Sequence, residues 1–211
     1  KASVINDKWA NVTELPFDSN EYSTAHPALS IDEKTLYFAS DMPGTLGSFD
    51  IYKVAINDDG TYGEPENLGT SINTKHREQF PFVSDYGVLY FTSDGHEGFG
   101  GLDVFRSNMV NGVFDQPVNL GSSINSSLDD FAFVIDSNTN SGFFSSDRKK
   151  GVGDADIYGF SMLEKEIECL QLITGVILNE TTKKPISNAV VSIFQNNELI
   201  NSVITSKTGN Y

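Results

Sequence analysis

"LYFTSDGHEGFGGLDVFRS", residues 89–107, is one of three stretches of the chain that superimpose without gaps. The other two are "LYFASDMPGTLGSFDIYKV", residues 36–54, and "GFFSSDRKKGVGDADIYGF", residues 142–160. Each copy contains Phe-x-Ser-Asp, then eight residues, then Asp, an aliphatic residue and an aromatic residue. The aspartate pairs are Asp41 and Asp50, Asp94 and Asp103, and Asp147 and Asp156. Equivalent aspartates are 53 residues apart, so the chain is built on a repeat of that period.

The segments between the copies repeat as well. "YGEPENLGTSIN", residues 62–73, matches "FDQPVNLGSSIN", residues 114–125. Trp9 and Leu15 are spaced like Tyr62 and Leu68, so residues 1–15 match the tail of an earlier copy. We therefore expect further copies upstream.

Each copy has the pattern of four short antiparallel strands. In the second copy we expect strands over residues 80–84, 88–93, 103–109 and 113–118. Turn residues separate them, including Ser84-Asp85-Tyr86-Gly87 and Asn111-Gly112. Four strands recurring at a fixed period predict an all-β fold of β-propeller blades. Three blades do not close a ring, so we expect residues 1–161 to be part of a larger propeller.

The composition agrees with a packed, acidic all-β chain. Hydrophobic residues make up 38% of the sequence, and Asp and Glu outnumber Lys and Arg 29 to 14, which gives a net charge of -15. Such a charge argues against nucleic acid as a partner. No apolar run reaches the length of about 18 residues that a membrane helix needs. The single cysteine, Cys169, excludes an internal disulfide and is read as a buried thiol.

The recurring aspartates allow two interpretations. In the first, each carboxylate caps backbone N–H groups of its own loop. In the second, some of them face a central channel and bind a ligand or a cation such as calcium. The candidate binding residues are Asp41, Asp50, Asp94, His96, Asp103, Asp147, Arg148 and Asp156. We expect no cofactor beyond that possible calcium ion, and the spacing identifies no metal ligand set.

The motifs give little support to phosphate binding or to catalysis. The glycines of residues 93–105 precede a strand and not a helix, which argues against a phosphate-binding loop. The chain has no Gly-x-Ser-x-Gly motif, and no acidic residue stands apart from its counterparts in the other copies. His96 lies on a variable loop tip, and Arg148-Lys149-Lys150 reads as a solvated tip. We therefore expect no catalytic residue.

The pattern changes near residue 162. The third copy lacks a fourth strand, and residues 162–171 read as a linker that begins with a short turn over residues 162–168. Residues 173–178 and 189–194 then read as strands joined by a turn at residues 181–185, with another hairpin beginning at Gly209. We expect residues 172–211 to be the start of a second, sandwich-like domain.

The repeat resembles the WD-like, TolB-like propeller repeats of bacterial envelope proteins. "EYSTAHPALSIDEKTLYFASDMPG", "SDGHEGFGGLDVF" and "PVNLGSSINSSLDDFAF" look very like the propeller of OmpA-family proteins from Bacteroidetes-type bacteria. "TGVILNETTKKPISNAVV", residues 174–191, is similar to their carboxypeptidase-regulatory-like, transthyretin-type sandwich. The resemblance implies a periplasmic, outer-membrane-associated protein of the type IX secretion and gliding systems. Its peptidoglycan-binding domain would lie outside this sequence.

These observations support three hypotheses. In the first, the chain is a non-enzymatic scaffold whose propeller docks an outer-membrane barrel or a secretion-machinery protein. In the second, the propeller binds a small ligand, glycan or peptide in its channel. In the third, it is the accessory propeller of a peptidase or glycosidase, for which the chain lacks a nucleophile motif.

Overall fold

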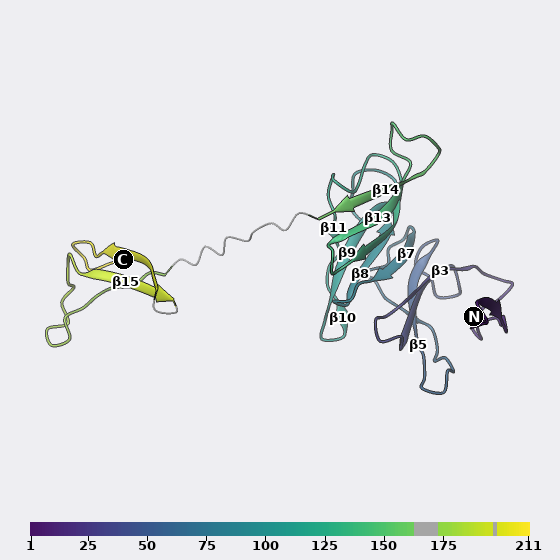
Figure 1. Ribbon diagram of the computed structural model, residues 1–211, viewed down its shortest axis with the longest axis horizontal. Coiled ribbons are helices and arrows are strands. Elements are labelled where there is room, and N and C mark those ends of the chain that lie inside the picture. Colours follow the sequence, from purple (N-terminus) through teal and green to yellow (C-terminus); the bar gives the residue numbers. More distant parts are fainter. Residues whose placement is uncertain (163–172, 196–197) are drawn as a thin grey trace. The chain divides into compact units, whose positions relative to one another are not determined.

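The computed structural model describes residues 1–162, 173–195 and 198–211, and within these ranges the fold is all-β. The chain divides into two compact units, Lys1–Leu163 and Glu164–Tyr211 (Figure 1). The described residues contain no helix of the length and apolarity needed to cross a membrane. The expected linker, residues 162–171, lies outside the described residues except for Met162, as do Cys169 and nearly all of the expected turn over residues 162–168.

Three antiparallel sheets make up most of the first unit, one for each copy of the repeat. The first sheet contains β3 (Thr24–Leu29), β4 (Thr35–Ser40), β5 (Asp50–Ala55) and β6 (Glu66–Asn67). The second contains β7 (Glu78–Val83), β8 (Val88–Ser93), β9 (Asp103–Val110), β10 (Val113–Phe114) and β11 (Val118–Asn119). The third contains β12 (Asp130–Asp136), β13 (Ser141–Ser146) and β14 (Asp156–Ser161).

The fourth strand of the second sheet is split in two, although residues 113–118 were expected to form one strand. Both β10 and β11 pair with β9. Between them, the carboxylate of Asp115 accepts a hydrogen bond from the backbone N–H of Asn108 at 2.8 Å. Pro117 follows and has no N–H to donate. The Asp115 side chain therefore takes the place of a backbone hydrogen-bond partner between the two short strands.

The turns between the strands have the chemistry that the sequence indicates. At the β7–β8 turn, Gly87 has φ 73° and its N–H donates to the carbonyl of Ser84 at 2.8 Å. At the β9–β10 turn, Asn111 and Gly112 have φ 53° and 81°. Positive φ at both central residues is the mark of the tight hairpin turn that matches strand twist.

The first strand of every sheet carries the same bulge. The pairing of each first strand with the second is interrupted at His26, Phe80 and Ala132, which have φ 54°, 51° and 53°. A left-handed backbone at a non-glycine residue is uncommon, and here it recurs at equivalent positions. The three sheets therefore share local geometry as well as strand order.

The hydrophobic core lies between successive sheets. The first strands of neighbouring sheets are adjacent, β3 beside β7 and β7 beside β12. One cluster joins Tyr37 and Ile51 of the first sheet to Leu89 and Phe91 of the second. Another cluster joins Tyr90 of the second sheet to Phe133 and Phe144 of the third. Because β4 and β8 are covered on both faces, they read as continuous apolar runs instead of alternating patterns.

Two glycines sit where successive sheets touch. A Cβ at Gly47 would overlap the carbonyl oxygen of His76, and one at Gly100 would overlap the backbone of Ser127. At the third equivalent, Gly153, the nearest atom to such a Cβ is 3.8 Å away.

Gly47→Ala and Gly100→Ala should each lower the free energy of unfolding by about 1 to 3 kcal/mol, because the overlapped atoms belong to backbone that must shift. Gly153→Ala should change it by less than about 0.5 kcal/mol. Urea unfolding followed by circular dichroism measures all three. Equal losses at the three positions would contradict the intersheet contact as the cause.

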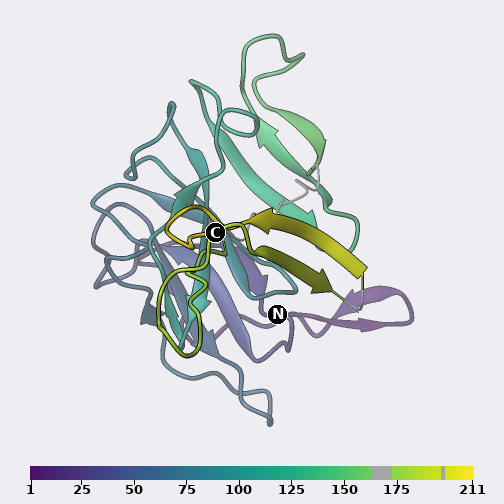
Figure 2. The ribbon, with the colours of Figure 1, turned by 90° about the vertical axis from the view of Figure 1, so that its left-hand side faces the viewer.

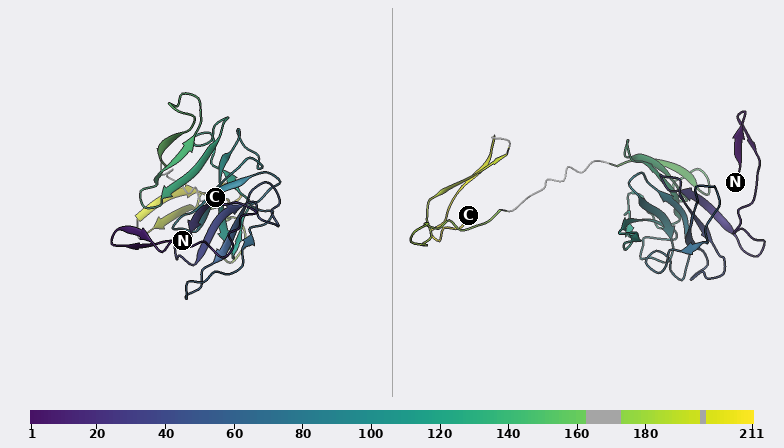
Figure 3. Two further views of the ribbon diagram at one scale, coloured as in Figure 1. Left: turned by 90° about the vertical axis from the view of Figure 1, so that its right-hand side faces the viewer. Right: turned by 90° about the horizontal axis from the view of Figure 1, so that it is seen from below.

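The N-terminal segment forms a hairpin of β1 (Ser3–Ile5) and β2 (Lys8–Ala10), which projects from the sheets (Figure 3). Leu15 packs against the first sheet, as its counterparts Leu68 and Leu120 pack against theirs. Trp9 instead pairs with Val4 and is 76% exposed, whereas its counterpart Phe114 is 8% exposed. The likeness of residues 1–15 to a repeat tail therefore extends to Leu15 but not to Trp9.

The second unit contains the hairpin of β15 (Val190–Gln195) and β16 (Glu198–Ile204), drawn in yellow in Figure 2. The strand expected over residues 173–178 is reduced to isolated bridges, from Val176 to Asn210 and from Leu178 to Pro185. The strand expected over residues 189–194 corresponds to β15, while β16 was not anticipated. Val190 and Phe194 are 67% and 62% exposed, so this hairpin has little core of its own.

Candidate interaction surface

The first aspartate of every copy binds the start of its own sheet. The carboxylates of Asp41, Asp94 and Asp147 accept hydrogen bonds at 2.6, 2.8 and 2.7 Å. The donors are the backbone N–H groups of Ser23, Arg77 and Asp129, which stand directly before β3, β7 and β12. These carboxylates therefore join the end of the second strand to the start of the first.

The second aspartate of every copy closes the loop that precedes it. Asp50 accepts from the N–H of Leu46 at 2.8 Å, and Asp156 accepts from the N–H of Val152 at 2.6 Å. Asp103 accepts from the N–H of Phe99 in the same way. All six aspartates thus cap backbone N–H groups, as the first of the two interpretations expects.

The closed loops present one exposed apolar side chain each, at the same position of the repeat. Leu46, Phe99 and Val152 are 46%, 52% and 100% exposed. In each case the backbone N–H of that residue is the group that the second aspartate binds. We call Leu46, Phe99 and Val152 the loop tips. The repeated carboxylates hold these tips in a defined backbone conformation.

Electrostatics differ among the aspartates. Burial raises the pKa of Asp94, but hydrogen bonds from the backbone and guanidinium of Arg77 outweigh it, so the pKa of Asp94 is lowered overall. The pKa of Asp103 is raised, because burial outweighs its bonds to the N–H groups of Phe99 and Gly100. Asp103 is 1% exposed and serves as a structural group.

The lowered pKa of Asp94 predicts an acid-dependent contribution to stability. Between the folded and unfolded pKa values the unfolded chain binds more protons, so stability falls as the pH falls through this window. Asp94→Asn should cost about 1 kcal/mol at pH 7 and progressively less below about pH 4. Urea unfolding of both proteins at several pH values measures the difference. Asp85→Asn, in an exposed turn, is the control, and a difference that does not depend on pH would contradict the assignment.

His96 and Arg148 turn inward, which corrects the expectation of variable or solvated loop tips. The His96 ring nitrogen Nε2 lies 2.7 Å from the carbonyl oxygen of Ile72, and its ring packs 5.3 Å from that of Phe105. The Arg148 guanidinium binds the carbonyl of Ile124 and lies over the rings of Phe144 and Tyr158. Equivalent aromatic residues therefore receive a basic side chain in both copies.

Both basic residues have an acidic counterpart on the first strand of their sheet. Arg148 forms an ion pair of 2.8 Å with Asp130, whose side chain is 0% exposed. Glu78 is also 0% exposed and accepts hydrogen bonds from Thr74 and Ser93. Burial raises the pKa of Glu78, and these hydrogen bonds together with the charge of His96 partly oppose the rise.

The first copy has a neutral version of the same arrangement. Met42 occupies the position of Arg148 and packs with Phe38 and Tyr52, the counterparts of Phe144 and Tyr158. Thr24 occupies the position of Asp130. Arg148 and Asp130 are thus an ion pair of the third copy that the first copy replaces by two neutral residues.

The other two histidines, His26 and His76, take no part in these contacts. His76 is exposed in the connection between the first two sheets, and His26 lies on β3 at the bulge. Burial lowers the pKa of His26. Within residues 1–162 and the described parts of the second unit, no three His, Cys, Asp or Glu side chains come close enough to hold a metal ion.

Sequence reasoning missed two buried amides between the sheets. Asn73 donates to and accepts from the backbone of Ile51 at 2.9 and 2.8 Å, and Asn125 does the same with Val104 at the same distances. A third hydrogen bond joins the Asn73 side-chain amide to the side-chain oxygen of Asn67. The repeated "NLG-x-S-I-N" motif could have indicated them, because its two copies end in Asn73 and Asn125.

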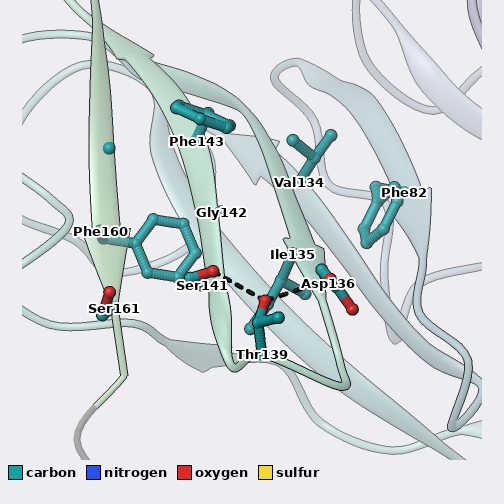
Figure 4. Close-up of a pocket in the computed structure, with 11 residues that line it drawn as sticks. Phe82, Val134, Ile135, Asp136, Thr139, Ser141, Gly142, Phe143, Phe160 and Ser161 are labelled. Carbon is teal, nitrogen blue, oxygen red and sulfur yellow. Dashed lines mark hydrogen bonds between the residues drawn. The ribbon is translucent and has the colours of Figure 1, made fainter.

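The third sheet has an open apolar surface. Phe143 and Ile157 are 59% and 77% exposed, although their counterparts in the other sheets are buried. A hollow of about 660 Å³ lies beside Phe143 and Phe160 and extends to Ser141 and Thr139 (Figure 4). Thr139 bonds to Asp136 and Ser141 at the rim of this hollow.

A second hollow, of about 320 Å³, crosses the first strands of the three sheets. His26 and Phe80 line it and stack on each other at 3.7 Å, and Phe80 lies 5.1 Å from Phe131. One face of each stacked ring is therefore already covered by protein. This groove is a candidate site for a small ligand.

No protein-family model matches the chain. No curated protein matches it either.

Proposed function

We propose that the three sheets are neighbouring blades of a β-propeller, and that this propeller is a non-enzymatic scaffold that docks another protein. The observation that carries the docking role is the recurrence of an exposed apolar loop tip in every copy, at Leu46, Phe99 and Val152. A surface whose backbone is already held in place loses little conformational entropy when a partner binds.

The arrangement of the sheets supports the propeller. Strands follow one another in chain order within each sheet, and the first strands of successive sheets are adjacent. The core lies between the sheets, as it does when blades pack face to face around an axis. Propellers have about four to eight blades, so further sheets complete the ring.

The use of polar residues supports a scaffold over an enzyme. The repeated aspartates bind backbone N–H groups, and Arg148 is engaged by Asp130 and the carbonyl of Ile124. These bonds give each group a structural role that needs no catalysis to account for it. What recurs on the outside is apolar contact surface, which suits a protein partner.

The resemblance to OmpA-family envelope proteins gives the setting. We infer that the scaffold works in the periplasm, next to the outer membrane. Its partner would be an outer-membrane barrel or a component of the secretion and gliding machinery, while neighbouring domains bind peptidoglycan. The net charge of -15 agrees with a protein partner and disfavours nucleic acid.

The experiment compares the chain with a variant that lacks its loop tips. Wild type and the triple variant Leu46→Ser, Phe99→Ser, Val152→Ser are used as bait in solubilised envelope extract, and bound proteins are quantified by mass spectrometry. An envelope protein retained by the wild type should drop by about tenfold or more with the variant.

The control carries three serine substitutions at exposed apolar residues elsewhere, at Tyr86, Val110 and Val113, which are 80%, 55% and 65% exposed. The partner should stay bound to this control. If both variants retain the same proteins as the wild type, the loop tips are not the docking surface and the proposal fails.

Ligand binding in the groove across the first strands is the second candidate. Its stacked His26 and Phe80 rings and the adjacent Phe131 favour an apolar or saccharide ligand. Mutual stacking of these rings leaves fewer free faces for a sugar, which makes docking the better supported function. Titration with envelope glycans, with Phe80→Ala as the comparison, tests this alternative.

A further inference from the structure

The turn that joins β9 to β10 contains the only Asn-Gly pair of the sequence, Asn111-Gly112. Both residues are exposed, and both have positive φ, of 53° and 81°. A Cβ built on Gly112 would meet no atom within 4 Å, so the space around this peptide is open. Water therefore has access to the side chain and to the backbone of the turn.

The strands on either side hold this turn by few contacts. The strand β10 contains two residues, and its pairs with β9 are Val113 with Val110 and Phe114 with Met109. Among the described residues, the N–H of Gly112 has no backbone hydrogen-bond partner. The end of a hairpin held in this way opens locally at little cost in free energy.

An exposed Asn-Gly pair with a free N–H meets the requirements for loss of the asparagine amide. The nitrogen of Gly112 loses its proton and forms a C–N bond to Cγ of Asn111, and the amide nitrogen leaves as ammonia. Glycine hinders this approach least, because it has no Cβ. Water then opens the five-membered ring at either carbonyl. One opening gives aspartate, and the other gives isoaspartate, in which the main chain runs through the side-chain carbonyl.

The asparagines in the matching turns of the other copies lack these features. In the first copy, the Asn57 amide donates to the hydroxyl of Thr61 at 2.8 Å, and an aspartate follows Asn57 in the chain. In the third copy, Ser141 follows Asn140, and its Cβ restricts the approach of the backbone nitrogen. The second copy therefore holds the most reactive asparagine of the three.

The turn lies close in sequence to a buried aromatic residue. Phe114 is 8% exposed and packs in the cluster between the first two sheets, with its ring 6.2 Å from that of Tyr37. Isoaspartate adds one carbon to the main chain of a two-residue turn, whose geometry is matched to the twist of its strands. The added carbon displaces β10, so the pairing of Phe114 with Met109 is lost.

We propose that Asn111 deamidates in the folded protein, and that the isoaspartate formed there loosens Phe114 from the contact between the first two sheets. The product carries one more negative charge than the starting protein, so anion exchange separates the two. The cluster between the second and third sheets includes no residue of this turn or of β10, so it should stay intact.

Incubation of the folded protein in mildly alkaline buffer tests the first step, because the attacking nitrogen must lose its proton. Peptide mapping by mass spectrometry with electron-transfer fragmentation distinguishes asparagine, aspartate and isoaspartate at each position. Asn111 should convert faster than Asn57 and Asn140 by about tenfold or more, which requires a barrier lower by about 1.4 kcal/mol. Asn111→Gln, whose longer side chain cannot form the five-membered ring, should give no isoaspartate at this position.

Hydrogen exchange of the purified isoaspartate form tests the second step. The control is Asn111→Asp, which adds the same charge without lengthening the main chain. Aspartate is also accepted in this type of turn, so the control should exchange like the wild type. The isoaspartate form should exchange faster in β9, β10 and β4, and its exchange in β13 and β14 should not change.

Two results would overturn the proposal. Conversion of Asn111 only in urea, or no faster than that of Asn57 and Asn140, would show that the folded turn protects the amide. Equal exchange in the isoaspartate form and in Asn111→Asp would show that the hairpin absorbs the added carbon and that Phe114 keeps its place.

Discussion

Arg148→Met should lower the free energy of unfolding by about 3 to 5 kcal/mol. Asp130 is 0% exposed, and the guanidinium of Arg148 lies 2.8 Å from its carboxylate. Without the arginine, a buried negative charge loses its cation. Urea unfolding measured by circular dichroism gives the loss, and hydrogen exchange should show it concentrated in β12, β13 and β14.

The first copy supplies the control, because it has Met42 and Thr24 at the equivalent positions. The double variant Asp130→Thr, Arg148→Met should therefore recover most of the stability that Arg148→Met loses. The expected coupling between the two substitutions is about 2 kcal/mol or more, within the range for residues in direct contact. Losses that simply add would show that Arg148 contributes by packing on Phe144 and Tyr158 and not by neutralising Asp130.

Asn125→Ala should be of similar severity, with a loss of about 2 to 5 kcal/mol. The Asn125 side chain is 2% exposed and bonds to both the N–H and the C=O of Val104, as well as to Asn119. Alanine would leave the N–H of Val104 buried without a partner, at a cost of about 1 to 3 kcal/mol. The carbonyl of Val104 would keep only the hydrogen bond from the N–H of Leu120, and each other lost hydrogen bond costs about 0.5 to 1.5 kcal/mol.

Asn73→Ala, at the equivalent contact with Ile51, should give a loss of the same size. Asn138→Ala is the control, since Asn138 is exposed and bonds only to Asp136. Thermal and urea unfolding of the three variants measures the difference. Losses at Asn73 and Asn125 no larger than at Asn138 would show that water satisfies the backbone groups.

The strands and turns of the first unit could be predicted because their signals are local. The β8 strand is where the Leu-Tyr-Phe run predicts it, and Asn111-Gly112 forms the expected turn. The split fourth strand could not be foreseen, since it depends on the Asp115 side chain reaching the N–H of Asn108. The spacing of apolar residues predicts which residues form strands. It does not predict where a side chain takes the place of a backbone hydrogen-bond partner between two strands.

The candidate site was predicted in part for a related reason. The repeated aspartates stand out at a fixed spacing, so they were found, and their capping role follows from their place beside strand ends. The inward turn of His96 and Arg148 depends on Glu78 and Asp130, each on another strand 18 residues away in the chain. The loop tips Phe99 and Val152 differ in type, so sequence comparison between copies passes over them.

The second aspartate of each copy holds the conformation of its loop through backbone N–H groups, so that conformation depends little on the side chain at the loop tip. Asp103 fixes the path of the chain through the N–H groups of Phe99 and Gly100, so it makes no demand on the side chain at the tip. The residue at each tip should then be interchangeable among the copies, whereas Met42, His96, Arg148 and the glycines at the sheet contacts stay with their own sheet. One sheet could in this way carry the tip of another. A family of binders with altered specificity could be selected on this frame by randomising the three tip residues, while the apolar layers underneath stay as they are.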